Sequence, residues 1–166
     1  LPLLGRTCKA RGVTAYIHPR DREMLADPAK AINSIDPRTL LGGLEWSEPD
    51  EVAELGDGMV MEIAGLSITV DHAPGHTGGS VMFRMPTSEE PLLFAGDVLF
   101  RNGIGRTDLP GGSMTEMVQS LRDKVLTLPD ETVVLPGHGP ETTIGRERVR
   151  NPYLREAYGA APMRGH

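Results

Sequence analysis

The sequence DHAPGHTGGS at residues 71–80 decides how the rest of this chain is interpreted. A run of β-forming residues, 66–70, leads directly into it. Pro74 and three glycines then end the strand in a tight turn. His76 is therefore predicted to project from an irregular turn at the end of a strand. Metal ligands and catalytic bases often lie on loops that are held in place by a rigid scaffold.

Two later strands are predicted to end in the same way. The apolar run 92–95 leads through a glycine to Asp97, and the run 132–135 leads through Pro-Gly to His138. Either feature alone is typical of an ordinary turn or a helix cap. In layered α/β folds, however, residues at strand ends meet at one edge of the sheet. We therefore expect His76, Asp97 and His138 to lie close together. Two imidazoles and a carboxylate suit zinc, iron or manganese.

Four ordered motifs resemble those of metallo-β-lactamase-fold hydrolases. They are PGHT at residues 74–77, FAGDVLF at 94–100, GRTD at 105–108 and PGHG at 136–139. The branch that they resemble most is the bacterial glyoxalase II-like thioesterases, which are similar to hydroxyacylglutathione hydrolase. The resemblance covers nearly the whole chain and implies the layered α/β fold of that family, an αββα sandwich.

The resemblance also implies a site for two metal ions, zinc first, with iron or manganese as alternatives. The position of His76 would bind the first metal, that of His138 the second, and that of Asp97 would bridge both, which also makes Asp97 the candidate catalytic residue. The implied reaction is hydrolysis of a small-molecule thioester by a metal-bound hydroxide, with no serine or cysteine nucleophile.

The chain departs from the family pattern in one respect. The family carries four further ligands in a His-x-His-x-Asp-His motif, and this chain contains no such motif. Residues 1–4 resemble the helix that follows the motif. We therefore expect that an N-terminal portion of about 60 to 80 residues is missing, and that residues 1–166 are the C-terminal two thirds of a single domain. One layer of the sandwich should then be incomplete and expose apolar surface, and the chain alone should bind metal poorly and have little activity.

Two other functions remain open. The GRTD segment also resembles the sulfur (persulfide) dioxygenases of the same fold, which hold one iron with two histidines and an aspartate at positions like His76 and Asp97, whereas the PGHG motif at His138 favours the hydrolases. The chain could instead be a non-catalytic remnant. Within GRTD, Arg106 and Asp108 are candidates for a substrate-contacting loop, and a structural ion pair between them is the commoner outcome.

The composition narrows the partners. One domain is expected for 166 residues, and a formal net charge of −6 without a basic run argues against nucleic acid. The sequence contains no long apolar stretch, so we expect no membrane partner. The lone Cys8 excludes an internal disulfide framework, is compatible with a cytoplasmic location and is interpreted as a partly buried helix residue. The oligomeric state is not predicted.

The patterning predicts helices at 1–11, 21–25, 113–128 and 146–150, and strands at 13–17, 59–63, 66–70, 80–85, 91–95 and 132–135. Ser113 is expected to cap its helix in a capping box with Glu116. From about residue 153 the tail is expected to be disordered after at most one helical turn. The long connection 29–49 is interpreted as structural cover, with substrate contact left open.

Three further side chains could belong to the site. His18 is interpreted as structural or solvent-facing, since the family pattern does not call for it. His72 and Thr77 are weak candidates for supporting the metal ligands, and for His72 a turn-stabilising role is favoured.

Overall fold

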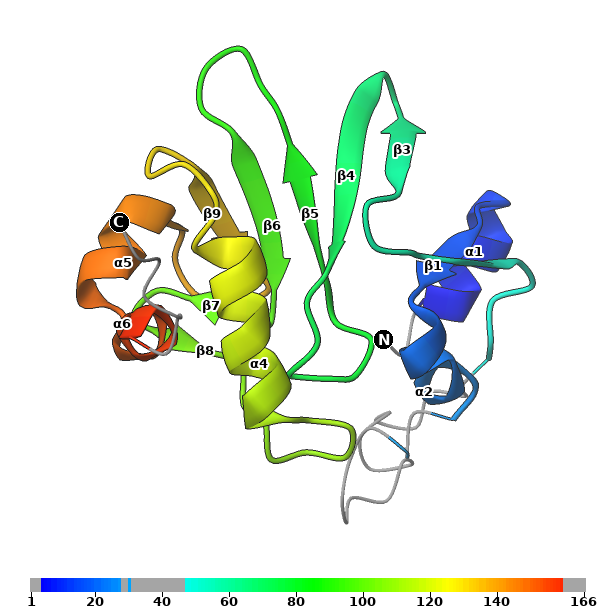
Figure 1. Ribbon diagram of the computed structural model, residues 1–166. Coiled ribbons are helices and arrows are strands. Elements are labelled where there is room, and N and C mark those ends of the chain that lie inside the picture. Colours follow the sequence, from blue (N-terminus) through cyan, green and yellow to red (C-terminus); the bar gives the residue numbers. More distant parts are fainter. Residues whose placement is uncertain (1–3, 28–29, 31–46, 160–166) are drawn as a thin grey trace.

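Figure 1 shows a computed structural model of the protein, which describes residues 4–27, 30 and 47–159. Its centre is a mixed six-stranded sheet with the strand order β10-β9-β6-β5-β4-β3. Neighbouring strands are antiparallel except for the parallel pair β6 and β9. The strands are β3 (Val60–Ile63), β4 (Leu66–His72), β5 (Val81–Met85), β6 (Leu92–Gly96), β9 (Val133–Pro136) and β10 (Thr142–Thr143).

Helices pack on one side of this sheet (Figure 1). They are α4 (Met114–Ser120), which continues as a π-helical segment (Leu121–Val125), α5 (Ile144–Arg150) and α6 (Pro152–Gly159). A two-stranded ribbon, β7 (Leu99–Phe100) and β8 (Gly103–Ile104), connects β6 to the loop before α4.

The N-terminal elements form a smaller unit beside β3 and β4 (Figure 1). They are α1 (Leu4–Arg11), β1 (Ala15–Ile17), the 3-10 helix η1 (Pro19–Asp21) and α2 (Arg22–Ala26). The strand β2 (Val52–Glu54), which the patterning did not predict, pairs in parallel with β1. The connection 29–49 lies outside the described residues except for Lys30 and residues 47–49.

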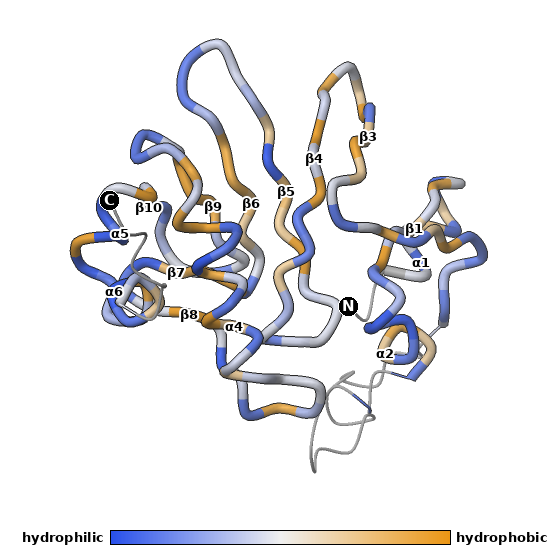
Figure 2. The backbone as a smooth tube through the Cα atoms, in the orientation of Figure 1, coloured by the Kyte–Doolittle hydropathy of each residue, from blue (hydrophilic) through white to orange (hydrophobic). Residues whose placement is uncertain are grey.

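The two faces of the six-stranded sheet are covered to different extents. Met82, Leu93 and Val134 are fully buried in one cluster with Met117 and Leu121 of the helices. Because alternate strand residues point to opposite faces, the neighbours of these core residues lie on the other face. There Phe94 pairs across the strands with Phe83 and Leu135 and is 39% exposed. Figure 2 shows the hydrophobic colouring of the strands and α4 against the hydrophilic loop between β5 and β6. The architecture agrees with the predicted layered α/β class.

The start of α4 confirms half of the predicted capping box. Ser113 caps the helix, with its Oγ accepting a hydrogen bond from the Glu116 backbone N–H at 3.2 Å. The reciprocal bond does not form, because the Glu116 carboxylate pairs with Arg20 and the Ser113 N–H donates to the Gly75 carbonyl. Both departures tie α4 to other parts of the chain.

The predicted disorder from about residue 153 is wrong as far as Gly159. Pro152 is the first residue of α6, a position where its fixed φ favours a helix. Leu154 and Ala157, one turn apart, are fully buried in the main core, which gives this helix tertiary support that its length alone would not predict. Residues 160–166 lie outside the described part. Over residues 4–27, 30 and 47–159, the structure contains no helix with the length and apolar character needed to span a membrane.

Candidate metal centre

The structure brings the three predicted metal ligands together. His76 lies on the loop after β4, Asp97 directly after β6, and His138 after β9. The His76 Nε2 is 3.5 Å from the Asp97 Oδ2, and the His138 Nδ1 is 3.1 Å from the Asp97 Oδ1. Each carboxylate oxygen therefore faces a different imidazole.

Helix α4 fixes the loop on the N-terminal side of His76. Gly75 has a φ of +151°, and a Cβ on it would lie 2.6 Å from the Met117 Cα, so the loop backbone packs directly on the helix. The Gly75 carbonyl accepts a hydrogen bond from the Ser113 N–H, and the Pro74 carbonyl accepts one from the Ser120 hydroxyl, both at 2.7 to 2.8 Å.

A second loop fixes the orientation of the His76 ring. The Nδ1 lies 2.8 Å from the backbone carbonyl of Arg106. Because a carbonyl can only accept, Nδ1 carries the proton, and the lone pair of a neutral ring is left on Nε2. This loop passes so close that a Cβ on Gly105 would lie 3.2 Å from the His76 ring.

The Nε2 lone pair of a neutral His76 and the Asp97 carboxylate then face each other across 3.5 Å. Both groups are electron-pair donors, so a cation bound by both, or a second proton on the ring, would stabilise the arrangement. Imidazole nitrogen and carboxylate oxygen are ligands of zinc, iron and manganese, and the donors fit such an ion in their chemistry.

The number of donors is smaller than a catalytic metal needs. Across residues 4–27, 30 and 47–159, no group of three or more histidine, cysteine, aspartate or glutamate side chains is arranged to hold a metal ion. A catalytic zinc ion has three protein ligands and a water. The three side chains therefore fit as part of a metal site, and their binding of metal stays a prediction.

The other predicted residues take distinct places. Arg106 and Asp108 form an exposed ion pair with two contacts of 2.8 Å, and the hydrogen bond from Arg106 lowers the pKa of Asp108 to about 2. The Thr77 hydroxyl contacts Asp21 and Ser80. Cys8 is buried in α1, as expected.

Within the described part of the chain, the other two histidines support turns. The His72 Nε2 lies 2.9 Å from the Gly78 carbonyl, which agrees with the turn-stabilising role favoured for it. The His18 Nδ1 accepts a hydrogen bond from the Arg20 N–H, so His18 caps η1. The rings of His18 and His72 stack at 3.9 Å. Burial and the neighbouring His72 lower the pKa of His18.

The sequence interpretation missed a buried carboxylate that supports this region. Glu147 in α5 is fully buried and accepts hydrogen bonds from the Thr142 hydroxyl, the Asn102 N–H and the Asn151 amide. The Asn151 amide also donates to the Gly103 carbonyl, so the network holds the β7–β8 ribbon that leads to Gly105 and Arg106. Glu147 stands among three arginines at 146, 148 and 150, a basic pattern that is typical of an exposed helix.

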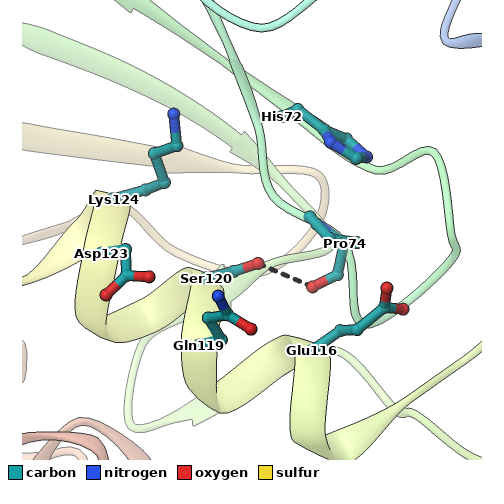
Figure 3. A pocket seen from close by; sticks show the side chains of 7 residues that line it. All are labelled: His72, Pro74, Glu116, Gln119, Ser120, Asp123 and Lys124. Atoms are coloured by element: carbon teal, nitrogen blue, oxygen red, sulfur yellow. Dashed lines mark hydrogen bonds between the residues drawn. The ribbon is translucent and has the colours of Figure 1, made fainter. Parts of the chain in front are cut away.

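A pocket of about 270 Å³ lies between the start of the His76 loop and α4 (Figure 3). It is lined by His72 at the end of β4, by Pro74 in the loop, and by Glu116, Gln119, Ser120, Asp123 and Lys124 from α4 and the following segment. It contains none of the three predicted metal ligands. The chemistry is therefore assigned to the strand ends rather than to this pocket.

The arrangement of motifs and strands corresponds to a known family. The sequence profile of the Metallo-beta-lactamase superfamily matches residues 4–138, and the chain belongs to this superfamily. An uncharacterized protein of Mycobacterium tuberculosis is 48% identical over 149 residues, which are 86% of this chain and 65% of the relative. The probable metallo-hydrolase YqgX of Bacillus subtilis is 38% identical over 143 residues, 86% of this chain and 64% of the relative. The chain thus spans just under two thirds of the length of these relatives.

A further relative carries a specific activity in its name. The hydroxyacylglutathione hydrolase GloC of Haemophilus influenzae is 42% identical over 98 residues, 59% of this chain and 45% of that protein. This match is shorter than the first two.

Solved structures confirm the predicted fold. BLEG-1 B3 metallo-beta-lactamase superposes with a TM-score of 0.74 at 37% identity, covering 91% of this chain and 69% of that one. A protein crystallised in a di-iron-bound form gives 0.71 at 36% identity, covering 92% and 70%. ETHE1 from Myxococcus xanthus gives 0.57 at 28% identity, covering 69% and 55%.

Proposed function

We propose that this protein is a metal-dependent hydrolase of small-molecule thioesters, of the hydroxyacylglutathione hydrolase type. The observation that carries the proposal is the Asp97 carboxylate placed between the His76 and His138 imidazoles at three strand ends. The 42% identity to hydroxyacylglutathione hydrolase GloC over 98 residues supports the thioester as substrate. The lone buried Cys8 supports a cytoplasmic location.

The residues of this chain would have separate roles. His76 and His138 would bind one metal ion each, and Asp97 would bridge the two ions. Zinc is the metal that we propose first; iron is the alternative, which the neighbour crystallised in a di-iron-bound form supports. Bound cations would supply a water of lowered pKa and would polarise the thioester carbonyl. The Arg106 carbonyl keeps the proton of His76 on Nδ1 and so directs Nε2 toward the site. The exposed Arg106 and Asp108 side chains are candidates for substrate contact.

The test compares this chain with a version extended at its N-terminus to the length of its relatives. We expect bound metal, and thiol release from a glutathione thioester, in the extended version and little of either in the 166-residue chain. Asp97→Ala in the extended version should abolish most activity while its circular dichroism spectrum is unchanged. Stoichiometric metal and full turnover in the 166-residue chain, or an active Asp97→Ala variant, would contradict the assignment of these ligands.

A second candidate is a mononuclear-iron sulfur (persulfide) dioxygenase, which the GRTD segment at 105–108 favours. The same preparation decides between the two. Iron content with oxygen consumption on a glutathione persulfide, and no thioester cleavage, would replace the first proposal with the second. A β-lactam belongs in the same panel because BLEG-1 is named as a metallo-beta-lactamase. Metal-loaded protein without any of these activities would favour a non-catalytic role.

A further inference from the structure

Asp21, from the N-terminal unit, contacts the loop that carries His76. Its Oδ2 accepts a hydrogen bond from the Thr77 hydroxyl at 2.5 Å, and its Oδ1 accepts one from the Gly79 N–H at 2.7 Å. Both oxygens of one carboxylate therefore hold the chain within three residues of His76. Hydrogen bonds to an ionised carboxylate are stronger than those between neutral groups.

The packing around Asp21 is as close as its hydrogen bonds. A Cβ on Gly79 would lie 2.6 Å from the Asp21 Cγ, and one on Gly78 would lie 3.0 Å from the Arg20 Nε. Arg20 also binds both carboxylate oxygens of Glu116 on α4, at 2.9 and 3.3 Å. The segment that carries Asp21 is thus attached to α4 as well as to the loop.

The loop is held on both sides of His76 by different elements. Helix α4 binds the residues before it, through the Pro74 and Gly75 carbonyls. Asp21 binds the residues after it, Thr77 and Gly79. With both flanks fixed, the imidazole keeps one direction, toward Asp97.

We propose that Asp21 is a positioning residue that aims the His76 imidazole at Asp97. A ligand must be held within about 0.5 Å of its productive place to function, and metal–nitrogen bonds of about 2 Å leave little tolerance. Without the Asp21 carboxylate, the Gly79 N–H loses its acceptor and the Thr77 hydroxyl is left with its Ser80 contact, so the residues after His76 lose both of these hydrogen bonds to the N-terminal unit. The aiming of the ring is a property of the metal-free chain, while its consequence for metal binding rests on the proposed function.

The first experiment is carried out on metal-free protein. The ring C–H signals of the histidines are recorded by NMR, with His76 and His138 assigned from His→Gln variants. In Asp21→Ala we expect the His76 signal to broaden or split, while the His138 signal is unchanged. Glu23→Ala is the matched control, because Glu23 lies in the adjoining helix α2 and its side chain pairs with the exposed Lys30, and it should leave both signals unchanged.

The second experiment adds zinc to the same variants made in the N-terminally extended version, which is the form expected to bind metal. We expect the zinc concentration at which the His76 signal shifts to rise by roughly tenfold in Asp21→Ala, the lower end of the effect of losing a residue that orients a metal ligand. The effect should be absent in an Asp21→Ala/His76→Gln double variant, where the His138 midpoint should equal that of His76→Gln alone. A general structural role would shift the midpoints in both backgrounds.

The outcomes separate the two proposals. Equal disturbance of His76 and His138 in metal-free Asp21→Ala, or disturbance of neither, would overturn the positioning role. A wild-type N-terminally extended version whose His76 does not respond to zinc would contradict the proposed function and leave the metal-free result to decide the role of Asp21. If Asp21→Ala does not fold, Thr77→Val removes one of the two hydrogen bonds and should produce a smaller change at His76, again with His138 unchanged.

Discussion

The tripeptide Pro-Gly-His occurs twice in this chain, at residues 74–76 and 136–138, and the structure treats the two copies differently. The His76 side chain is 21% exposed and that of His138 is 67% exposed. Helix α4, the Gly105–Arg106 segment and Asp21 surround the first copy. At the second copy, the Gly137 N–H donates to the Gly96 carbonyl, and the His138 and Phe100 rings form a T-shaped pair with their centroids 4.8 Å apart.

The comparison shows that a motif specifies the type of ligand but not the rigidity of its position. Both histidines follow a strand and face Asp97, so both are placed by the same local pattern. The rigidity of His76 comes from contacts with residues 30 or more positions away in the sequence. Changes at these distant contacts should therefore affect His76 and spare His138.

The largest expected effect concerns the buried network behind the His76 side of the site. Glu147→Ala leaves the Arg146 charge and the Asn102 N–H without their partner, and we expect a loss of about 3 to 5 kcal/mol in the free energy of unfolding. Urea denaturation measures it. Glu156→Ala, on the exposed side of α6, is the matched control and should change stability by less than about 0.5 kcal/mol. A loss below about 1 kcal/mol in Glu147→Ala would contradict the role given to this network.

The same carboxylate should make stability depend on pH. Burial raises the pKa of Glu147, but the hydrogen bonds from Thr142, Asn102, Asn151 and Arg146 outweigh it, so the pKa lies below its ordinary value of 4.5. A lowered pKa means that the contribution is present above 4.5 and is lost as the pH falls through the folded-state value. When the pH is lowered below 4.5, the free energy of unfolding of Glu147→Gln should therefore fall less than that of the wild type. An unchanged acid profile would show that other groups govern it.

Two glycines with positive φ lie beside the site histidines, Gly75 before His76 and Gly139 after His138, and they differ in the space around them. Gly75→Ala combines a positive φ with a contact of 2.6 Å to Met117, and we expect it to cost on the order of 3 kcal/mol. Gly139, beside His138, has a φ of +84° with nothing within 4 Å of an added Cβ, so Gly139→Ala should cost about 1 kcal/mol. Thermal unfolding of both variants measures the difference. Equal costs would remove the contrast between the two loops.

The smallest expected effect is at a single hydrogen bond. Ser120→Ala removes the donor to the Pro74 carbonyl and should lower the free energy of unfolding by about 1 kcal/mol. Ser88→Ala, in the exposed β5–β6 loop, is the control and should change nothing measurable. Hydrogen exchange should also become faster at Gly75 and Thr77 but not around His138. Faster exchange at both loops would mean that Ser120 supports the fold in general rather than the His76 loop.

The features that the sequence predicts correctly are those set by local pattern. The strands before His76, Asp97 and His138, and the Ser113 cap, follow from apolar runs and turn residues within a few positions. The Arg106–Asp108 ion pair is equally local. The proximity of His76, Asp97 and His138 follows from a general property of layered folds, in which residues at strand ends meet at one edge of the sheet.

What could not be predicted depends on distant contacts. Asp21 meets Thr77 across 56 positions, and Glu147 meets Asn102 across 45 positions, so a single sequence contains no pattern that pairs them. The burial of Glu147 is also contrary to the usual exposure of glutamate. The length of α6 was not predicted for a similar reason. This helix is stabilised by the packing of Leu154 and Ala157 on the core, which the local sequence does not reveal.

The measurement that tests the central claim most directly is a zinc titration of the N-terminally extended version, monitored through the ring signals of His76 and His138. If both rings and Asp97 share one metal site, the two signals should respond over the same range of zinc concentration. In Asp97→Ala, both midpoints should rise by at least roughly tenfold, while the urea midpoint is little changed. A response of only one histidine, or midpoints that Asp97→Ala does not move, would contradict a shared metal centre at these strand ends.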